Sequence, residues 1–268
     1  MFKNVSKIRT ISRCTWCTQI CQNIRNFSSE TPNPNVTFDF TDKFKTSHIR
    51  ISPFQRVLLG AGSSIMSLID PSRADMIAIM GETTGAAAIN YMHSQMSKDE
   101  EGSRILREKP VINSSTIDLE ALKSLPDNTL GRAYVRFLEK NKVTPDSRDI
   151  VKFIDDVELA YVIQRYREVH DLVHTVLDMP TNMLGEVTVK WVEAFQTRLP
   201  LCVFGGVFGA VRLAPKQRMK YVNYYLPWAI KTGMNSKFFM NVYYEQRWDQ
   251  SMESLLKELN IEPLVLPK

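Results

Sequence analysis

Long apolar runs, cysteine and histidine are all scarce in this sequence. No uninterrupted apolar stretch reaches the roughly 18 residues of a membrane-spanning helix, so no such helix is expected. Of the four cysteines, Cys14, Cys17 and Cys21 lie near the N-terminus. No second CxxC completes a zinc tetrad with Cys14 and Cys17, which argues against a structural zinc site there. Cys202 stands alone among apolar residues, so we expect a buried thiol and no disulfide.

Acidic residues are absent from the first 29 positions. This leader carries five basic residues, Lys3, Lys7, Arg9, Arg13 and Arg25. They account for the whole formal net charge of +5, because the chain has 34 Lys and Arg against 29 Asp and Glu. The basic balance therefore gives no reason to expect a nucleic-acid partner.

The leader also lacks the apolar core of a secretory signal, and it is rich in Ser and Thr. These properties predict a mitochondrial transit peptide over residues 1–29, with processing near Ser28. The alternative is a basic tail without a targeting role. Residues 30–268 are then the mature domain, which has enough chain to bury a core of its own.

From residue 30 onward the pattern is helical, since apolar residues recur at a period near 3.6 and strand-like alternation is scarce. We therefore predict a single all-α, multi-helix domain. Ser52 followed by Pro53 predicts a helix start, and Asp70-Pro71 predicts its end. Residues 37–51 before it are expected to be extended or irregular.

Further boundaries follow from capping residues and prolines. Ser72 is expected to cap one helix that runs to about residue 96, followed by a solvated turn over 98–103. Ser115, with Asp118 three residues later, is expected to form a capping box at the start of a helix that Pro126 ends. A long helix is predicted over residues 146–178, and Asn182 is expected to cap the next one.

The stretch HDLVHTVLDMPTNMLGE, residues 170–186, contains two of the four histidines. On a helix, with His170 at zero, His174 falls at about 40° and Asp171 at about 100°, so the three share one arc. Glu186 lies in the first turn of the next helix, and an antiparallel hairpin brings it to face the histidines. Two imidazoles with one or two carboxylates suit Zn²⁺ with an open position, and they also suit non-haem iron. The alternative is the solvated face of an amphipathic helix, because the same arc holds Gln164, Glu168 and Asp178.

Several segments resemble one family. HDxxH, then eleven residues, then Glu is the motif of the mitochondrial ubiquinone-biosynthesis protein known as coenzyme Q protein four. The likeness extends over GETTG (81–85), LPDNTLGRAY (125–134), ELAYVIQRYREVHD (158–171), GEVTVKWVEAFQTRLP (185–200) and YYLPWA (224–229). It covers the chain from about residue 45 to the C-terminus. The resemblance implies that the family's zinc ligands fall on His170, Asp171, His174 and Glu186.

The resemblance also implies a location and partners. It predicts a peripheral protein on the matrix side of the mitochondrial inner membrane, within a multi-subunit complex of coenzyme Q biosynthesis enzymes. Two functions follow from it. One is metal-dependent removal of the C1 carboxylate from a polyprenylated 4-hydroxybenzoate-type ring. The other is a non-catalytic, lipid-binding scaffold that organises the complex.

For a decarboxylase, each polar residue has a candidate role. A metal ion acts as Lewis acid and template, and Asp171 or Glu186 delivers the proton if it is not a tight ligand. Arg167 is placed to pair with an anionic substrate group, or else to form a surface salt bridge with Asp171. Zn²⁺ is the expected cofactor and Fe²⁺ the alternative, since oxidative chemistry requires iron with O₂ or a partner enzyme. For a scaffold, four ligands close the site and the metal is structural.

Two further segments bear on the lipid tail and the membrane. Small residues in the apolar helices at 57–69, 80–89 and 202–213 predict close approach of another helix or of a lipid chain. Residues 214–231 interleave basic and aromatic side chains, which suits a membrane interface, although an ordinary helix–loop surface with buried aromatics has a similar composition.

Overall fold

The computed structural model describes residues 39–71 and 73–267, and this part of the chain is all-α. It contains no β-strand, only an isolated bridge between Thr129 and Ser251. No helix among the described residues is both long and apolar enough to cross a membrane. The predicted transit peptide and the cysteines Cys14, Cys17 and Cys21 lie outside the described residues.

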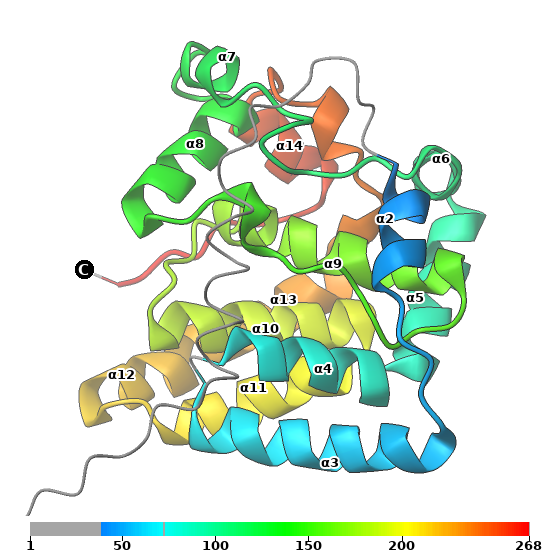
Figure 1. Ribbon diagram of the computed structural model, residues 1–268. Helices are drawn as coiled ribbons and strands as arrows, with labels where there is room; N and C mark the ends of the chain where they lie inside the picture. The colour runs from blue at the N-terminus through cyan, green and yellow to red at the C-terminus, as the bar shows by residue number, and fades with distance from the viewer. Residues whose placement is uncertain (1–38, 72, 268) are drawn as a thin grey trace, which may run out of the picture. The chain divides into compact units, whose positions relative to one another are not determined.

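The helices follow one another through short connections (Figure 1). They are α2 (Phe40–Ser47), α3 (Pro53–Ile69), α4 (Ala74–Thr84), α5 (Ala86–Lys98), α6 (Glu100–Glu108), α7 (Leu119–Lys123), α8 (Leu130–Asn141), η1 (Pro145–Ser147), α9 (Val157–Val176), α10 (Met183–Thr197), α11 (Pro200–Val211), α12 (Pro215–Lys220), η2 (Tyr221–Tyr225), α13 (Leu226–Asn235), η3 (Phe239–Asn241), η4 (Tyr244–Gln246) and α14 (Met252–Glu258).

Helix α9 lies at the centre of the core. Of its 20 residues, 15 are buried, so other elements cover it on almost every side. Helices α5 and α8 pack on α9, while α10 packs chiefly on α11 and α13 (Figure 1). Helix α3 packs on α4 at the lower edge of the view. The polar side chains of α9 are therefore held inside the protein, where each needs a partner.

Several predicted boundaries are confirmed. Ser52 and Gln55 form a capping box at the start of α3, with Pro53 at its first position, and α3 ends at Ile69. Asn182 caps α10 as expected, by accepting a hydrogen bond from the Gly185 N–H. Cys202 is buried and its thiol is free.

The prediction of an extended or irregular arm over residues 37–51 is wrong for Phe40–Ser47, which form helix α2. Asp39 caps this helix by accepting from the Thr41 N–H. Phe40 and Phe44, one turn apart, are both buried and stack with ring centroids 5.9 Å apart. The edge of Tyr161 in α9 meets Phe40 at 5.4 Å, so burial of two aromatic rings stabilises a short helix that its sequence only weakly indicates.

Three other boundaries also differ from the prediction. The single helix expected up to residue 96 is divided at Gly85, where a Cβ atom would lie 2.4 Å from the Gly81 carbonyl oxygen. The turn expected at 98–103 is the start of α6, which Asp99 caps. Asp118, not Ser115, caps α7.

The long helix predicted over 146–178 begins only at Val157, where Asp156 caps α9. The segment before it is irregular because buried side chains bind its backbone. The Val151 N–H donates to Gln164, and the N–H groups of Lys152 and Phe153 donate to Glu82. These bonds satisfy polar groups that a helix would have paired internally.

Candidate metal centre

A tight connection between α9 and α10 creates the site. Asp178 follows the end of α9 with a left-handed φ of 51°, and Pro180 prevents the helix from continuing. The chain then passes so close to α10 that a Cβ atom on Gly185 would lie 1.9 Å from the Pro180 carbonyl oxygen. Only glycine fits at this position, and Glu186 directly follows it.

The two helices run antiparallel, as the sequence predicts. His174 of α9 lies opposite Glu186 at the start of α10, His170 lies opposite Glu186 and Glu193, and Tyr166 lies opposite Glu193. From His174 back to Tyr166 in α9, the partner in α10 changes from Glu186 to Glu193, as expected for two antiparallel helices. Side chains rather than closely packed backbones fill the space between the helices, which leaves room for a polar centre.

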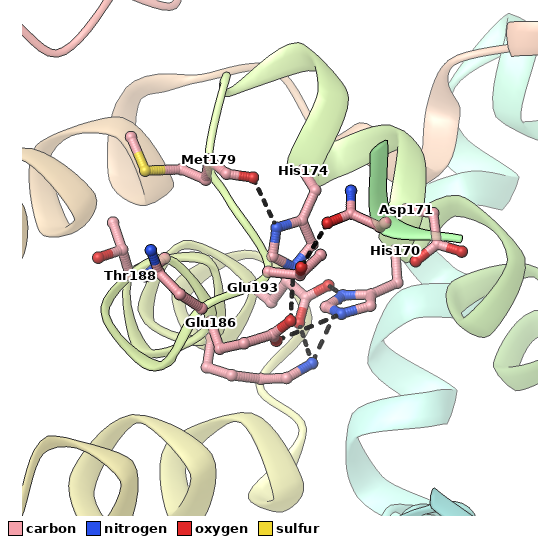
Figure 2. A network of polar contacts seen from close by, with 12 residues as sticks. His170, Asp171, His174, Met179, Glu186, Thr188 and Glu193 are labelled. Carbon is pink, nitrogen blue, oxygen red and sulfur yellow. Dashed lines mark hydrogen bonds and ion pairs between the residues drawn. The ribbon is translucent and has the colours of Figure 1, made fainter. Parts of the chain in front are cut away.

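His170, His174 and Glu186 converge in this centre (Figure 2). One potential ligand atom from each residue lies within 4.8 Å of the others. The Nε2 atoms of His170 and His174 are 3.8 Å and 3.4 Å from the two Glu186 oxygens. The two imidazole rings are nearly perpendicular, with centroids 4.8 Å apart. Each ring directs its Nε2 atom toward the Glu186 carboxylate.

Hydrogen bonds on the far side of each ring assign its protons. His174 Nδ1 lies 3.0 Å from the Met179 carbonyl oxygen, which can only accept, so Nδ1 carries the hydrogen. His170 Nδ1 lies 2.6 Å from Glu193 Oε1, which is also an acceptor. When the two rings are neutral, as metal binding requires, the lone pair of each is therefore on Nε2 and points toward Glu186, the arrangement that metal-binding histidines adopt.

These residues fit a cation. The Nε2 atom of His174 is buried and has no hydrogen-bond partner, and it faces a carboxylate that is also an acceptor. Two such acceptors repel each other unless a positive charge lies between them. A divalent ion held by His170, His174 and Glu186 would provide that charge, and imidazole with carboxylate is a ligand set for Zn²⁺ or Fe²⁺.

Glu193 and Lys190 form a second layer that the sequence interpretation missed. Glu193 is 3% exposed and its second oxygen accepts from the Tyr166 hydroxyl and the Lys190 ammonium, each at 2.8 Å. Burial raises the pKa of Glu193, but the charges of His170 and Lys190 hold it well below its usual range. The sequence spacing could have identified Glu193, because it follows Glu186 by seven residues and therefore lies on the same face of α10.

Asp171 is not part of the converging group. Its carboxylate accepts a 2.7 Å hydrogen bond from Arg148, and Figure 2 shows it turned away from Glu186. The Asp171 side chain is 9% exposed and that of Arg148 is 30% exposed, so the carboxylate end of the ion pair is buried. Arg148 belongs to the irregular segment before α9, and Asp171 therefore helps to attach that segment to the helix.

Arg167 has Glu82 of α4 as its carboxylate partner, at 2.6 Å, and it also donates to the Ala78 carbonyl at 2.8 Å. The surface salt bridge with Asp171 is therefore wrong. The solvated-face interpretation holds only for Asp178, beyond the end of α9, and it is also wrong for Gln164 and Glu168, which are 4% and 5% exposed. These two bond to each other and to the backbone N–H groups of Val151 and Ile112.

Comparison with known proteins gives a consistent result. Residues 45–265 match the family model described as "Coenzyme Q (ubiquinone) biosynthesis protein Coq4". The chain is 53% identical over 262 residues to the mitochondrial ubiquinone biosynthesis protein COQ4 homolog of Drosophila ananassae, covering 95% of this chain and 98% of that one. It is 57% identical over 226 residues to the protein of the same name from Anopheles gambiae, covering 84% and 80%.

A solved structure shares the fold. The crystal structure of a Nostoc punctiforme protein, whose name refers to ubiquinone biosynthesis, superposes with a TM-score of 0.60 at 19% identity. The superposition covers 75% of this chain and 95% of that chain. At this identity the likeness concerns the helical architecture alone.

Proposed function

This chain belongs to the coenzyme Q (ubiquinone) biosynthesis protein Coq4 family, and on that premise we propose that it is a metal-dependent decarboxylase of ubiquinone biosynthesis. The substrate in this proposal is a polyprenylated 4-hydroxybenzoate-type ring. The reaction exchanges the C1 carboxylate for a proton. The bond between the ring carbon and the carboxyl carbon breaks, CO₂ leaves, and the ring carbon takes the proton.

The observation that carries the proposal is the number of converging residues. His170, His174 and Glu186 are three, and Asp171 is engaged by Arg148 instead of completing a fourth position. Catalytic zinc centres keep three protein ligands and one open position, whereas structural centres are closed. A divalent ion bound here supplies a Lewis acid for a carboxylate or phenolate oxygen of the substrate.

The remaining residues have distinct tasks in this proposal. Glu193 and the Met179 carbonyl hold the two imidazoles with Nε2 toward Glu186. The Glu186 side chain is 36% exposed, so water reaches the centre and supplies the ring proton. Asp171 and Arg167 act at a distance from the reacting atoms, because each is held by an ion pair that orients the irregular segment or α4.

The proposal extends to location and partners. The relatives are named mitochondrial, and the basic, acid-free leader is consistent with that address. We place the protein at the matrix side of the inner membrane, peripherally bound, with the other coenzyme Q biosynthesis enzymes as partners.

The second candidate function, a lipid-binding organiser of that complex, is favoured by one observation. Exposed apolar side chains line much of α3 and α11.

Release of labelled CO₂ tests the reaction. The purified protein is loaded with Zn²⁺ or Fe²⁺ and given a prenylated 4-hydroxybenzoate with a ¹³C carboxylate, with and without O₂. We expect metal-dependent release that His174→Ala and Glu186→Gln abolish. The matched control is His93→Ala, because His93 pairs with Glu158 away from the centre. Absence of release from a folded, metal-loaded protein with its partner enzymes present would favour the organiser.

A further inference from the structure

Helix α3 exposes its apolar side chains to solvent. Phe54, Val57, Leu58, Ile65 and Ile69 are 76%, 71%, 63%, 58% and 69% exposed. Its only buried residues are Gly60 and Ser63. A helix of a soluble domain normally turns its apolar stripe toward the core, so α3 has the reverse orientation.

Small and polar residues make the contact between α3 and the rest of the protein. A Cβ atom on Gly60 would lie 3.2 Å from the Thr84 methyl carbon of α4, so the two helices approach closely. The hydroxyls of Ser63 and Ser64 both donate to the Gly60 carbonyl and need no outside partner. The small stripe of α3 is thus used for packing on α4, and its large apolar residues are left outward.

Helix α11 continues this exposed surface. Its residues Val203, Phe204, Val207 and Phe208 are 40–44% exposed, and Val211 is 68% exposed. The C-terminal ends of α3 and α11 meet, because the Arg212 guanidinium donates to the Leu68 carbonyl. We call the exposed apolar residues of α3 and α11 the apolar face; Figure 1 shows both helices toward the lower edge, with α12 beside them.

The charges around the apolar face are mainly basic, and the acidic residues Asp70 and Asp75 lie just past the C-terminal end of α3, close to Arg73. Residues 194–244 contain no Asp or Glu, and α3 carries a single charge, Arg56. Arg212, Lys216, Arg218 and Lys220 are exposed at the end of α11 and along α12. Arg218 donates to the Val211 carbonyl, which fixes this basic segment against the apolar face.

We infer that the apolar face is the surface by which this protein docks on an anionic lipid bilayer. The inference rests on the proposed peripheral location and names the helices that perform it. A bilayer matches both properties, since its acyl region accepts the apolar side chains of α3 and α11 and its phosphates pair with the basic residues of α12. A second copy bound through the same face would instead add further basic residues, with no Asp or Glu from residues 194–244 to pair with them.

Vesicle flotation of the full chain tests the inference. Vesicles contain phosphatidylcholine with or without cardiolipin, and every variant keeps the same basic leader, so that its contribution is common to all comparisons. The apolar variant combines Val57→Ser, Ile69→Ser and Val211→Ser, each at a residue about 70% exposed. Its control combines Val143→Ser and Val265→Ser, which are exposed outside the apolar face. The charge variant is Lys216→Glu with Lys220→Glu, and its control is Lys98→Glu with Lys140→Glu.

We expect the wild type and both controls to float with cardiolipin vesicles, and the apolar variant to bind them at least about tenfold more weakly. The charge variant should lose a similar factor, and its residual binding should depend less on salt than that of the wild type. If the wild type floats and the apolar variant floats equally, another surface binds the membrane and this inference is wrong. Failure of the wild type to float contradicts the peripheral location itself. An apolar variant that changes only from dimer to monomer in sedimentation assigns the face to a second copy, which also overturns the inference.

Discussion

The Nδ1 atom of His170 lies 2.6 Å from Oε1 of Glu193, a buried carboxylate seven residues beyond Glu186 on the same helix. Burial lowers the pKa of His170, but the negative charge of Glu193 and the hydrogen bonds to Glu186 and Glu193 together outweigh it and shift that pKa upward. The contact fixes the orientation of the ring, and at the proposed metal site it would make the ring a stronger ligand, as carboxylate–histidine–metal arrangements do.

Replacing Glu193 by Gln should therefore weaken metal binding by about 10–100-fold. Titration against a chromogenic chelator measures the affinity. Glu158→Gln is the matched control, because Glu158 also pairs with a histidine, His93, outside the centre. Equal affinity in the wild type and Glu193→Gln would show that the contact does not support the metal.

Bound metal should raise the melting temperature. At a free metal concentration of about 100 times Kd, the ligand adds about 2.7 kcal/mol to the free energy of unfolding. For a domain of this size that corresponds to an increase of roughly 5–10 °C, which a chelator should reverse. Scanning calorimetry of His174→Ala should show no increase, whereas His93→Ala should behave as the wild type does.

Gly185→Ala should disturb the connection that places Glu186. The added Cβ has a backbone oxygen 1.9 Å away, so either the Pro180 turn or the first turn of α10 must move. We expect a loss of about 1–3 kcal/mol in urea unfolding together with weaker metal binding. Gly62→Ala is the control, since nothing lies within 4 Å of its added Cβ and alanine favours the helix. Comparable destabilisation by both substitutions would contradict the role of the close approach.

Arg167→Ala distinguishes a structural arginine from one that binds substrate. Glu82 is 3% exposed, and removal of Arg167 leaves its charge without an ion-pair partner, at a cost of roughly 3–5 kcal/mol. Arg104→Ala, which removes an exposed pair with Glu108, should cost far less stability, because water and salt screen that pair. An Arg167→Ala protein that keeps its stability but loses substrate affinity would return Arg167 to the binding site.

Cys202 should resist alkylation in the folded protein. Burial, and next the charge of Glu193, raise the pKa of its thiol to about 12, so almost no thiolate exists at pH 8. Mass spectrometry of the peptide that contains Cys202 should show little reaction with iodoacetamide until denaturant is added. Rapid modification of the native protein at pH 8 would contradict the buried position.

Local sequence patterns were sufficient for the fold class and for part of the centre. Periodicity of 3.6 residues predicts helices wherever a long amphipathic stretch repeats it, as in α3, α8 and α10. Capping by Ser52 and Asn182 depends only on neighbouring residues, so these ends were predicted correctly. The spacing of His170, His174 and Glu186 likewise fixes which side chains meet once the connection between the two helices is tight.

Tertiary packing decided the rest, because it depends on residues far apart in the chain. Helix α9 begins at Val157 and not at residue 146, because Glu82 and Gln164 accept hydrogen bonds from the backbone before it. Asp171 forms an ion pair with Arg148, and Arg167 forms one with Glu82. Neither partner lies on α9, so a helical wheel of α9 does not include them. The sequence by itself determined that two histidines and a carboxylate share one hairpin. Only the fold determined that the arc around them is buried, that Glu193 supports it, and that the apolar side chains of α3 face outward, since burial is a property of the whole assembly of helices.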